Sequence, residues 1–315
     1  MDSLDPIGLT TLRACVREGT FERAAKALSI TPSAVSQRMR ALEQAVGTVL
    51  VTRTKPVQAT PDGEVLLALA VQWSLLRDEA VGRLTASQAS GTADADDHPA
   101  VRVSVPIACG ADALALLLLP AMAAVEREVP VIFEIFREDE AHSVDLLRQG
   151  RVVCALSSDP VPIHGHSAEP LGTLRYLPLA TPAYIERHLP HGADAESLAT
   201  APLIAFDHKD DHQYAYLRRL LDQDLRPPTT YVPANREFEE AVLLGLGWGL
   251  VPEGRMAEEI EAGRLTRIGP GYRDVPVVWH RPRFASAVLD LLGEQLAERA
   301  REVLRPREAW DEAGA

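Results

Sequence analysis

The chain lacks the sequence features that mark several large classes of protein. Its three cysteines, Cys15, Cys109 and Cys154, lie far apart without a Cys-x-x-Cys pair, which argues against a disulfide framework or a structural zinc site. The longest apolar stretch, residues 113–125, is too short to span a bilayer and contains a proline. The N-terminus carries no basic segment followed by an apolar run, so we expect a cytoplasmic protein that is not exported.

Motifs of common enzyme classes are missing as well. The sequence contains no Gly-x-Ser-x-Gly elbow, no Gly-x-x-x-x-Gly-Lys phosphate loop and no His-Glu-x-x-His. The nine histidines are scattered, and the closest pair, His164 and His166, has no third ligand nearby. We therefore expect no enzymatic activity, no metal and no cofactor, although a redox role of Cys109 stays open.

Positive charge is concentrated at the N-terminal end of an otherwise acidic chain. The formal net charge is −13, yet residues 1–60 contain eight Lys or Arg and five Asp or Glu and so carry +3. The rest of the chain therefore carries −16. Because charges are screened over roughly 8 Å at physiological salt, the local charge decides whether DNA is attracted. The N-terminal segment has the sign that DNA binding needs.

Residues 20–46, TFERAAKALSITPSAVSQRMRALEQAV, predict two short helices joined by a tight turn. The second helix has a clear start, since the Thr31 hydroxyl can cap it and Pro32 occupies the first helical position. Three apolar residues recur at helical spacing and are expected to face inward: Val35, Met39 and Leu42. The opposite stripe carries small polar and basic side chains, namely Ser33, Ser36, Gln37 and Arg40, with Arg38 on its flank.

These outward side chains are of the types that read the major groove of DNA. Glutamine can bond adenine through two hydrogen bonds, arginine can do so with guanine, and serine can bond a base or a phosphate. We interpret residues 1–60 as a helix-turn-helix domain that binds double-stranded DNA. The alternative is an ordinary helical hairpin whose polar stripe faces water.

A long helix is predicted after Thr60, because a hydroxyl cap, a proline and acidic residues stand at its start. Its apolar positions step by three and four residues, close to the spacing of a coiled-coil seam: Leu66, Leu69, Trp73, Leu76, Ala80 and Leu84. We expect this helix, residues 61–88, to dimerise and to place two reading helices on a two-fold symmetric operator. The alternative is packing against the chain's own C-terminal domain. Residues 89–100 are small, polar and acidic and predict a flexible hinge.

From residue 101 onward, short β-rich runs alternate with helical stretches. Strands are predicted at 101–105, 131–136, 152–157, 175–180, 203–206, 230–232, 248–251 and 275–279, and helices at 112–126, 143–149, 213–222, 237–244 and 286–301. Such alternation is typical of parallel sheets covered by helices, and the length allows two subdomains with a ligand cleft between them. The predicted fold class is α/β for this effector domain, residues 101–315, with subdomain I at about 101–165 and 270–304 and subdomain II at about 166–269.

The run AAKALSITPSAVSQRMRALEQAVGTVLVTR resembles the N-terminal winged helix of LysR-type transcriptional regulators, in which AVSQ-x-x-x-x-LE and G-x-x-L-x-x-R recur. The run GLGWGLVPEGRM at 245–256 is similar to a glycine-rich turn in that family's effector domain, whose fold is like that of periplasmic solute-binding proteins. The resemblance implies a wing at residues 49–60, with Arg53 and Lys55 on the flanking phosphates. It also implies a homodimer paired into a homotetramer, a small-molecule effector and RNA polymerase as a further partner. The short apolar runs noted above predict no membrane partner.

Within this family the chain is similar to the ArgP and LysG subgroup, which regulates export of lysine and arginine. Segments that carry the likeness include 137–140, 148–153 and 205–211. A basic amino acid needs carboxylates as partners when it leaves water. Acidic residues near the ends of predicted strands or the start of a predicted helix are the candidates: Asp112, Glu138, Asp139, Glu140 and Asp207. A solvated acidic surface is the alternative.

The chain departs from the subgroup at the first helix of the C-terminal domain. The subgroup has Asn-Ala-Asp-Ser followed by a Thr-Trp pair, where this chain has Gly110-Ala111-Asp112-Ala113 and then Leu116-Leu117. The lost amide, hydroxyls and indole are donors for the α-carboxylate of an amino acid, although the Gly110 N–H at a helix N-terminus can still attract an anion. A regulator of this family that responds to a different, neutral or anionic metabolite is therefore the second hypothesis.

Overall fold

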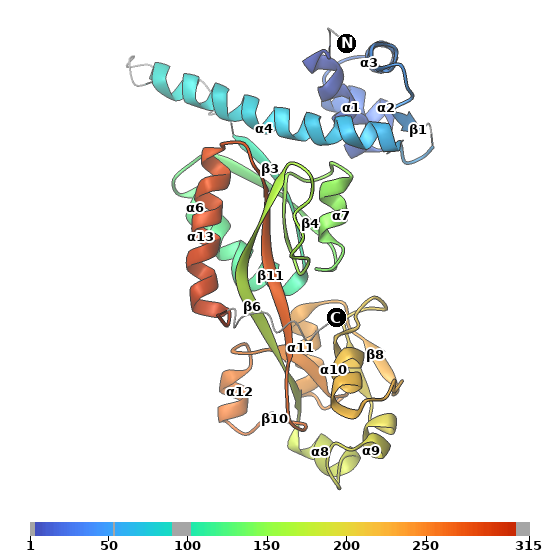
Figure 1. Cartoon of the computed structure of the whole chain (residues 1–315), viewed down its shortest axis with the longest axis vertical. Helices are drawn as coiled ribbons and strands as arrows, with labels where there is room; N and C mark the ends of the chain where they lie inside the picture. Colours follow the sequence, from blue (N-terminus) through green and yellow to red (C-terminus); the bar gives the residue numbers. More distant parts are fainter. Residues whose placement is uncertain (1–3, 53, 90–101, 307–315) are drawn as a thin grey trace.

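The computed structural model describes residues 4–52, 54–89 and 102–306. Its N-terminal end is a small head of three helices and a two-stranded antiparallel wing (Figure 1), with these bounds: α1 Pro6–Glu18, α2 Phe21–Ala27, α3 Pro32–Val46, β1 Val51–Thr52 and β2 Gln58–Ala59. The predicted start of α3 is confirmed, since Thr31 Oγ1 accepts the N–H of Ala34 at 3.2 Å and Pro32 opens the helix. Val35, Met39 and Leu42 are buried and pack in the core of the head.

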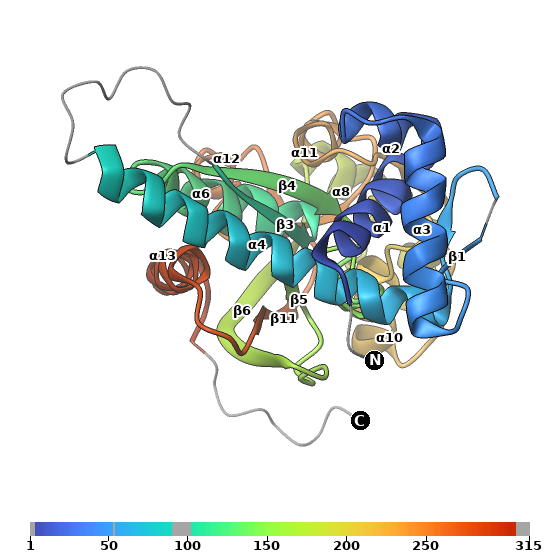
Figure 2. The ribbon, with the colours of Figure 1, turned by 90° about the horizontal axis from the view of Figure 1, so that it is seen from above.

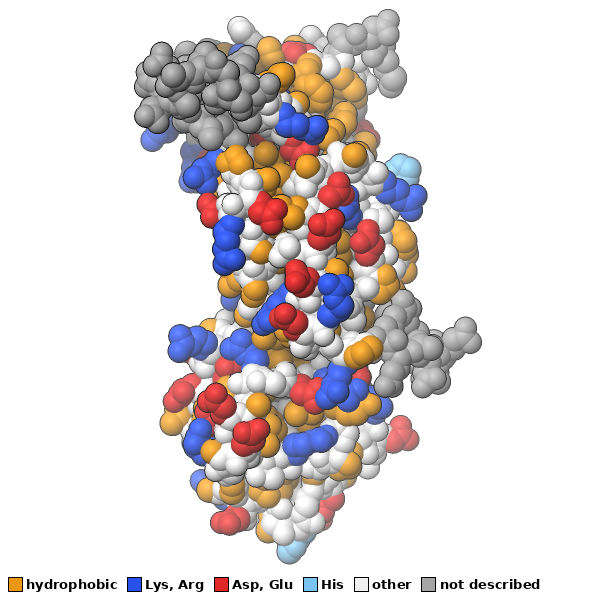
Figure 3. Space-filling model, turned by 90° about the vertical axis from the view of Figure 1, so that its left-hand side faces the viewer, with side chains coloured by type: hydrophobic (Ala, Val, Ile, Leu, Met, Phe, Trp, Pro, Cys, Tyr) orange, Lys and Arg blue, Asp and Glu red, His pale blue; other side chains and the backbone are white. Residues whose placement is uncertain are grey.

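α4, Pro61–Ala89, runs from the head across one end of the effector region (Figures 1 and 2). Val71 and Leu75 on its inner face belong to the core of that region. The outer face carries most of the predicted seam, with Leu69 41%, Trp73 39% and Leu84 64% exposed. Figure 3 shows hydrophobic side chains gathered at the end of the molecule that carries α4. α4 thus packs on its own chain with one face and leaves the seam uncovered within one subunit.

Two close contacts fix α4 on the effector region. Gly150 packs tightly on the backbone of α4, because a Cβ at residue 150 would lie 2.2 Å from the amide nitrogen of Ala68. The φ of Gly150, +64°, also favours glycine. Glu79, which is 5% exposed, reaches the start of α13, Ala287–Val303. Its Oε1 accepts the hydroxyl of Ser286 at 2.6 Å and the N–H of Val288 at 3.1 Å. A carboxylate at this position also balances the positive end of the helix dipole.

Replacing Glu79 by Ala is expected to lower the free energy of unfolding by about 1–3 kcal/mol, because a buried N–H loses its acceptor and α13 loses its anion. The matched control is Arg83→Ala on the same helix, where the guanidinium is 74% exposed and 3.8 Å from Glu79, so we expect a change within about 0.5 kcal/mol. Calorimetric melting of both variants checks this. Equal melting temperatures for Glu79→Ala and wild type would contradict a stabilising role for this contact.

The effector region is built on one mixed seven-stranded sheet. The strand order is β10-β6-β11-β5-β3-β4. The seventh strand, β9, pairs with residues 176–179 of β6. The strands are β3 Val103–Cys109, β4 Val131–Arg137, β5 Cys154–Ser157, β6 His166–Ala180, β9 Gly249–Pro252, β10 Thr266–Arg267 and β11 Arg273–Pro282. A separate parallel pair consists of β7 Leu203–Ala205 and β8 Thr229–Tyr231. Among the described strands, only β3-β4, β3-β5 and β7-β8 are parallel, so the predicted parallel pairing is correct for these pairs and wrong for the rest of the large sheet, which is antiparallel.

The long antiparallel strands β6 and β11 join two lobes (Figure 1). Lobe I contains β3, β4 and β5 with α13 and the helices α5 Ala111–Ala113, α6 Leu119–Glu126 and α7 Ser143–Arg148. Lobe II contains β7 to β10 with α8 Pro182–His188, α9 Ala195–Thr200, α10 His212–Leu221, α11 Asn235–Leu243 and α12 Ala257–Glu261. The predicted boundary at residue 166 falls at the start of β6, which runs through both lobes. The predicted α/β class and the N-terminal helix-turn-helix are confirmed.

The predicted helix 112–126 is continuous but contains a π-helical turn, η1, at Leu114–Leu118 between α5 and α6. Pro120 explains the irregularity, because it has no N–H to donate to the carbonyl of Leu116. Arg299 of α13 takes that place, with Nε donating to the Leu116 oxygen at 3.0 Å. The helix therefore stays intact and its first turn is held at the junction between the lobes.

Candidate functional site

The predicted DNA-reading side chains lie on the outer face of α3. Ser33, Gln37 and Arg40 are exposed, and Ser36 and Arg38 are half-buried at the edges of the stripe. α3 lies on the side of the head that faces away from the effector region (Figures 1 and 2). The face is therefore free within the subunit to enter a groove. Contact of these residues with bases stays a prediction.

The wing stands beside this helix, as Figure 2 shows. Lys55 is exposed at the tip between β1 and β2, and Arg53 lies outside the described residues. Within the described part of the chain, no hydrogen bond or ion pair engages the side chains of Gln37, Arg40 or Lys55. Their donors are therefore available to bases and phosphates.

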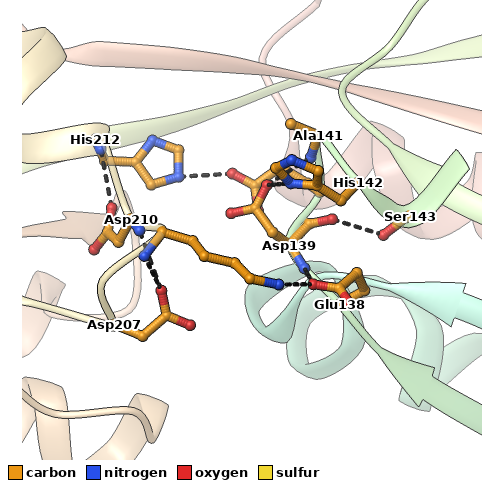
Figure 4. Close-up of polar contacts among 10 residues, drawn as sticks. Glu138, Asp139, Ala141, His142, Ser143, Asp207, Asp210 and His212 are labelled. Atoms are coloured by element: carbon orange, nitrogen blue, oxygen red, sulfur yellow. Dashed lines mark hydrogen bonds and ion pairs between the residues drawn. The ribbon is translucent and has the colours of Figure 1, made fainter. Parts of the chain in front are cut away.

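A cavity of about 170 Å³ lies between the lobes, where β4 and β7 end. One water needs on the order of 10–15 Å³, so the cavity has room for about 11–17 water-sized groups. Seven carboxylate side chains line it: Asp112, Glu138, Asp139, Glu140, Asp207, Asp210 and Glu239. The five acids predicted from the sequence are among them, so the structure brings all five together. Figure 4 shows Glu138 and Asp139 facing Asp207, Asp210 and His212 across the cavity.

Asp112 projects from the first turn of α5 and is held by two donors from other elements. The Tyr176 hydroxyl on β6 donates to Oδ2 at 2.9 Å, and the Asn235 amide on α11 donates to Oδ1 at 2.7 Å. Burial raises the pKa of Asp112 to about 6, although the Tyr176 hydrogen bond and the charge of Arg255 oppose the shift. The carboxylate thus remains charged at neutral pH at an energetic cost that a ligand cation would relieve.

Glu140 and His212 form a pair across the cavity, with Nε2 and Oε1 2.6 Å apart. Burial disfavours both charges, but the hydrogen bond and charge of the partner outweigh it, so the pKa of Glu140 is lowered and that of His212 is raised. Glu138 makes a second pair of this kind, since Lys209 Nζ donates to its Oε1 at 2.9 Å. Both pairs join the loop after β4 in lobe I to the segment after β7 in lobe II.

The remaining predicted acids hold the local backbone. Asp207 Oδ1 accepts the N–H groups of Lys209 and Asp210 at 2.7 and 3.1 Å, and Asp139 Oδ1 accepts the N–H of Ala141 at 2.9 Å. These two carboxylates shape the rims of the cavity as well as contributing charge. Sequence reasoning did not assign Tyr176, His212 or Asn235 to the site, because they come from elements remote in sequence.

A redox role for Cys109 is not supported. The side chain is fully buried, and burial raises its pKa to about 12. Cys15 and Cys154 are buried as well, and burial raises their pKa values too. Since the thiolate is the reactive form, these thiols behave as small core side chains. Among the described residues, no helix is both long and apolar enough to cross a bilayer.

Comparison with protein families assigns both halves of the chain. Residues 8–64 match "Bacterial regulatory helix-turn-helix protein, lysR family", and residues 100–301 match "LysR substrate binding domain". The HTH-type transcriptional regulator LysG of Mycobacterium tuberculosis is 36% identical over 91% of this chain and 90% of its own length. The lysine export transcriptional regulatory protein LysG of Corynebacterium efficiens is 37% identical over 96% of this chain and 100% of its own.

Solved structures agree over nearly the whole chain. ArgP from Mycobacterium tuberculosis superposes with a TM-score of 0.83 at 34% identity, covering 97% of this chain and 100% of its own. Full-length LysG from Corynebacterium glutamicum with bound effector Arg superposes with a TM-score of 0.76 at 37% identity, covering 96% of this chain and 100% of its own. These likenesses agree with the exposed α3 of the head and with the acidic cavity between the two lobes. The chain therefore belongs to the LysR family of transcriptional regulators.

Proposed function

We propose that this regulator senses a basic amino acid, lysine or arginine, in the cavity between its lobes and controls an amino-acid exporter gene. The observation that carries the proposal is the set of seven carboxylates around one cavity. An ammonium or guanidinium group that leaves water needs anionic partners, which this cavity supplies. An anionic metabolite would be repelled by these charges. A neutral one would leave uncompensated the carboxylates that have no ion-pair partner within the described residues, namely Asp112, Asp207 and Asp210. Relatives named for lysine export and a relative with bound Arg support the assignment.

The proposed unit is a homodimer formed through the outer face of α4, paired further into a tetramer on promoter DNA in the cytoplasm. Leu69, Trp73 and Leu76 on that face are 41%, 39% and 37% exposed and form a contiguous apolar row, which is typical of a surface that a second chain covers. Effector binding would favour one arrangement of the lobes, and only a difference in affinity between the two arrangements can shift DNA binding.

The identity of the effector is tested by isothermal titration calorimetry of the full-length chain with arginine, lysine and citrulline. Citrulline has the shape of arginine but carries a neutral urea group, so it isolates the contribution of the positive charge. We expect arginine or lysine to bind at least about tenfold more tightly than citrulline, since hydrogen bonds to charged groups contribute about 1.5–3 kcal/mol. Tighter binding of citrulline would overturn the proposal and favour the neutral-metabolite alternative.

Arginine affinity is expected to fall as the pH drops below 6. A cation beside Asp112 stabilises its ionised form. In the unbound protein the pKa of Asp112 is about 6, so below this pH the carboxyl group must lose a proton when arginine binds. Between pH 7.5 and pH 5 this linkage weakens binding about tenfold. Titration calorimetry at both pH values measures the change. Asp112→Asn removes the titrating group, and a variant that retained the full pH dependence would show that another group is responsible.

A further inference from the structure

Arg137 is the last residue of β4 and lines the cavity beside the acids. Its guanidinium carbon lies 5.4 Å from the centre of the Phe206 ring, which follows β7 in lobe II. Within the described part of the chain, no carboxylate forms an ion pair with Arg137, although the acids that follow it are close in sequence. The contact with an aromatic face uses none of the five N–H donors in a conventional hydrogen bond.

The other side-chain donors of the described lining each take part in a hydrogen bond. His212 is the second cationic residue of the lining, and its Nε2 is held by Glu140 at 2.6 Å. The Tyr176 hydroxyl donates to Asp112. The amide of Gln213 donates to the carbonyl of Ile204 at 2.9 Å. Arg137 is therefore the one cationic group of the described lining whose donors are free.

An amino acid carries a carboxylate as well as its cationic groups. In a cavity lined by seven acids, that carboxylate is repelled unless a cation receives it. The sequence suggested the N–H of Gly110 as an alternative receptor. In the structure the Glu140 carboxylate lies beside Gly110, because a Cβ on this glycine would be 3.1 Å from Glu140 Oε2. A ligand carboxylate at Gly110 would therefore be repelled.

We infer that Arg137 binds the α-carboxylate of the effector and selects amino acids over amines that lack this group. The inference rests on the proposed function, because it presupposes a basic amino acid in this cavity. A planar guanidinium pairs with a carboxylate through two parallel N–H bonds. The acids of the cavity bind the cationic groups of the ligand at the same time. Each charged end of the ligand is then paired with a side chain of opposite charge.

The test compares arginine with agmatine, which is arginine without its carboxylate, by titration calorimetry on the full-length chain. Wild type is expected to bind arginine at least about tenfold more tightly than agmatine. Arg137→Ala is expected to weaken arginine binding at least about tenfold and to leave agmatine binding within about twofold. Arg137→Lys should restore part of the arginine affinity, because it keeps the charge without the planar fork.

The matched control is Arg151→Ala, because Arg151 also lies 5.4 Å from a phenylalanine ring, Phe136, but does not line the cavity. It should leave both affinities unchanged. Equal losses for arginine and agmatine in Arg137→Ala, or no loss for either, would overturn the role of Arg137. Equal wild-type affinities for the two ligands would overturn it as well and leave the proposed function intact. A wild-type chain that bound neither arginine nor lysine would contradict the proposed function itself.

Discussion

Replacing Gln37 and Arg40 together by Ala is expected to abolish recognition of the operator while leaving the fold intact. Both side chains are exposed on the outer face of α3, so their removal creates no cavity in the head. A side chain that bonds a base edge through two hydrogen bonds contributes about 1–3 kcal/mol of discrimination. The double variant should therefore lose about 2–6 kcal/mol, or roughly 30-fold to 10⁴-fold in affinity for the preferred sequence.

The measurement starts from a DNA site selected in vitro by wild type from a random pool. Fluorescence anisotropy then gives the affinity of each variant for that site and for scrambled DNA. Lys55→Ala should weaken both DNAs alike and lower the salt dependence by about one counterion, because phosphate contacts carry no sequence information. Arg17→Ala, on α1 and paired with Glu18 at 3.0 Å, serves as the control. An unchanged ratio of specific to scrambled affinity in the double variant would show that α3 does not read the bases.

Asp112→Asn is expected to lower the affinity for arginine by about 10- to 150-fold, because the hydrogen bond to a charged ligand group is lost. The substitution keeps the size of the side chain. Its amide oxygen can still accept from Tyr176, and its NH2 can donate to the Asn235 oxygen once that amide turns over. It also removes a buried charge, so the unliganded protein should be no less stable at pH 7. Loss of binding together with unchanged melting would separate a role in the site from a role in folding.

Asp145→Asn is the matched control, because Asp145 lies in the first turn of α7, pairs with Arg148 at 2.7 Å and does not line the cavity, and it should leave arginine binding within about twofold. Calorimetry of both variants with arginine and citrulline gives the comparison. If Asp112→Asn bound arginine as tightly as wild type, the cationic group of the effector would have to contact other acids of the cavity.

Local signals in the sequence were sufficient to predict the head. The Thr31 cap, Pro32 and the spacing of Val35, Met39 and Leu42 act within one helix, and the structure confirms each of them. Five of the seven acids that line the cavity were also predicted, because the ends of strands and the start of a helix are local features as well. Their contact with an effector stays a prediction.

The partners of these acids were not predicted, since they depend on contacts between distant segments. Asn235 meets Asp112 across 123 residues, and His212 meets Glu140 across 72. The antiparallel pairing of β6 with β11 was missed for the same reason. An alternating run of strands and helices fixes the layers of a fold but does not fix the direction in which two remote strands pair.

The two contacts that hold α4 have a consequence for signalling. Gly150, which follows α7, and Glu79, which bonds the start of α13, both attach this helix to lobe I. We therefore expect the head to move together with lobe I, so that an effector-induced displacement of lobe II would leave the orientation of α3 relative to lobe I unchanged. The effector signal would then have to reach the DNA through contacts between lobe II and neighbouring subunits. A single subunit would bind the amino acid without a change in its affinity for the promoter.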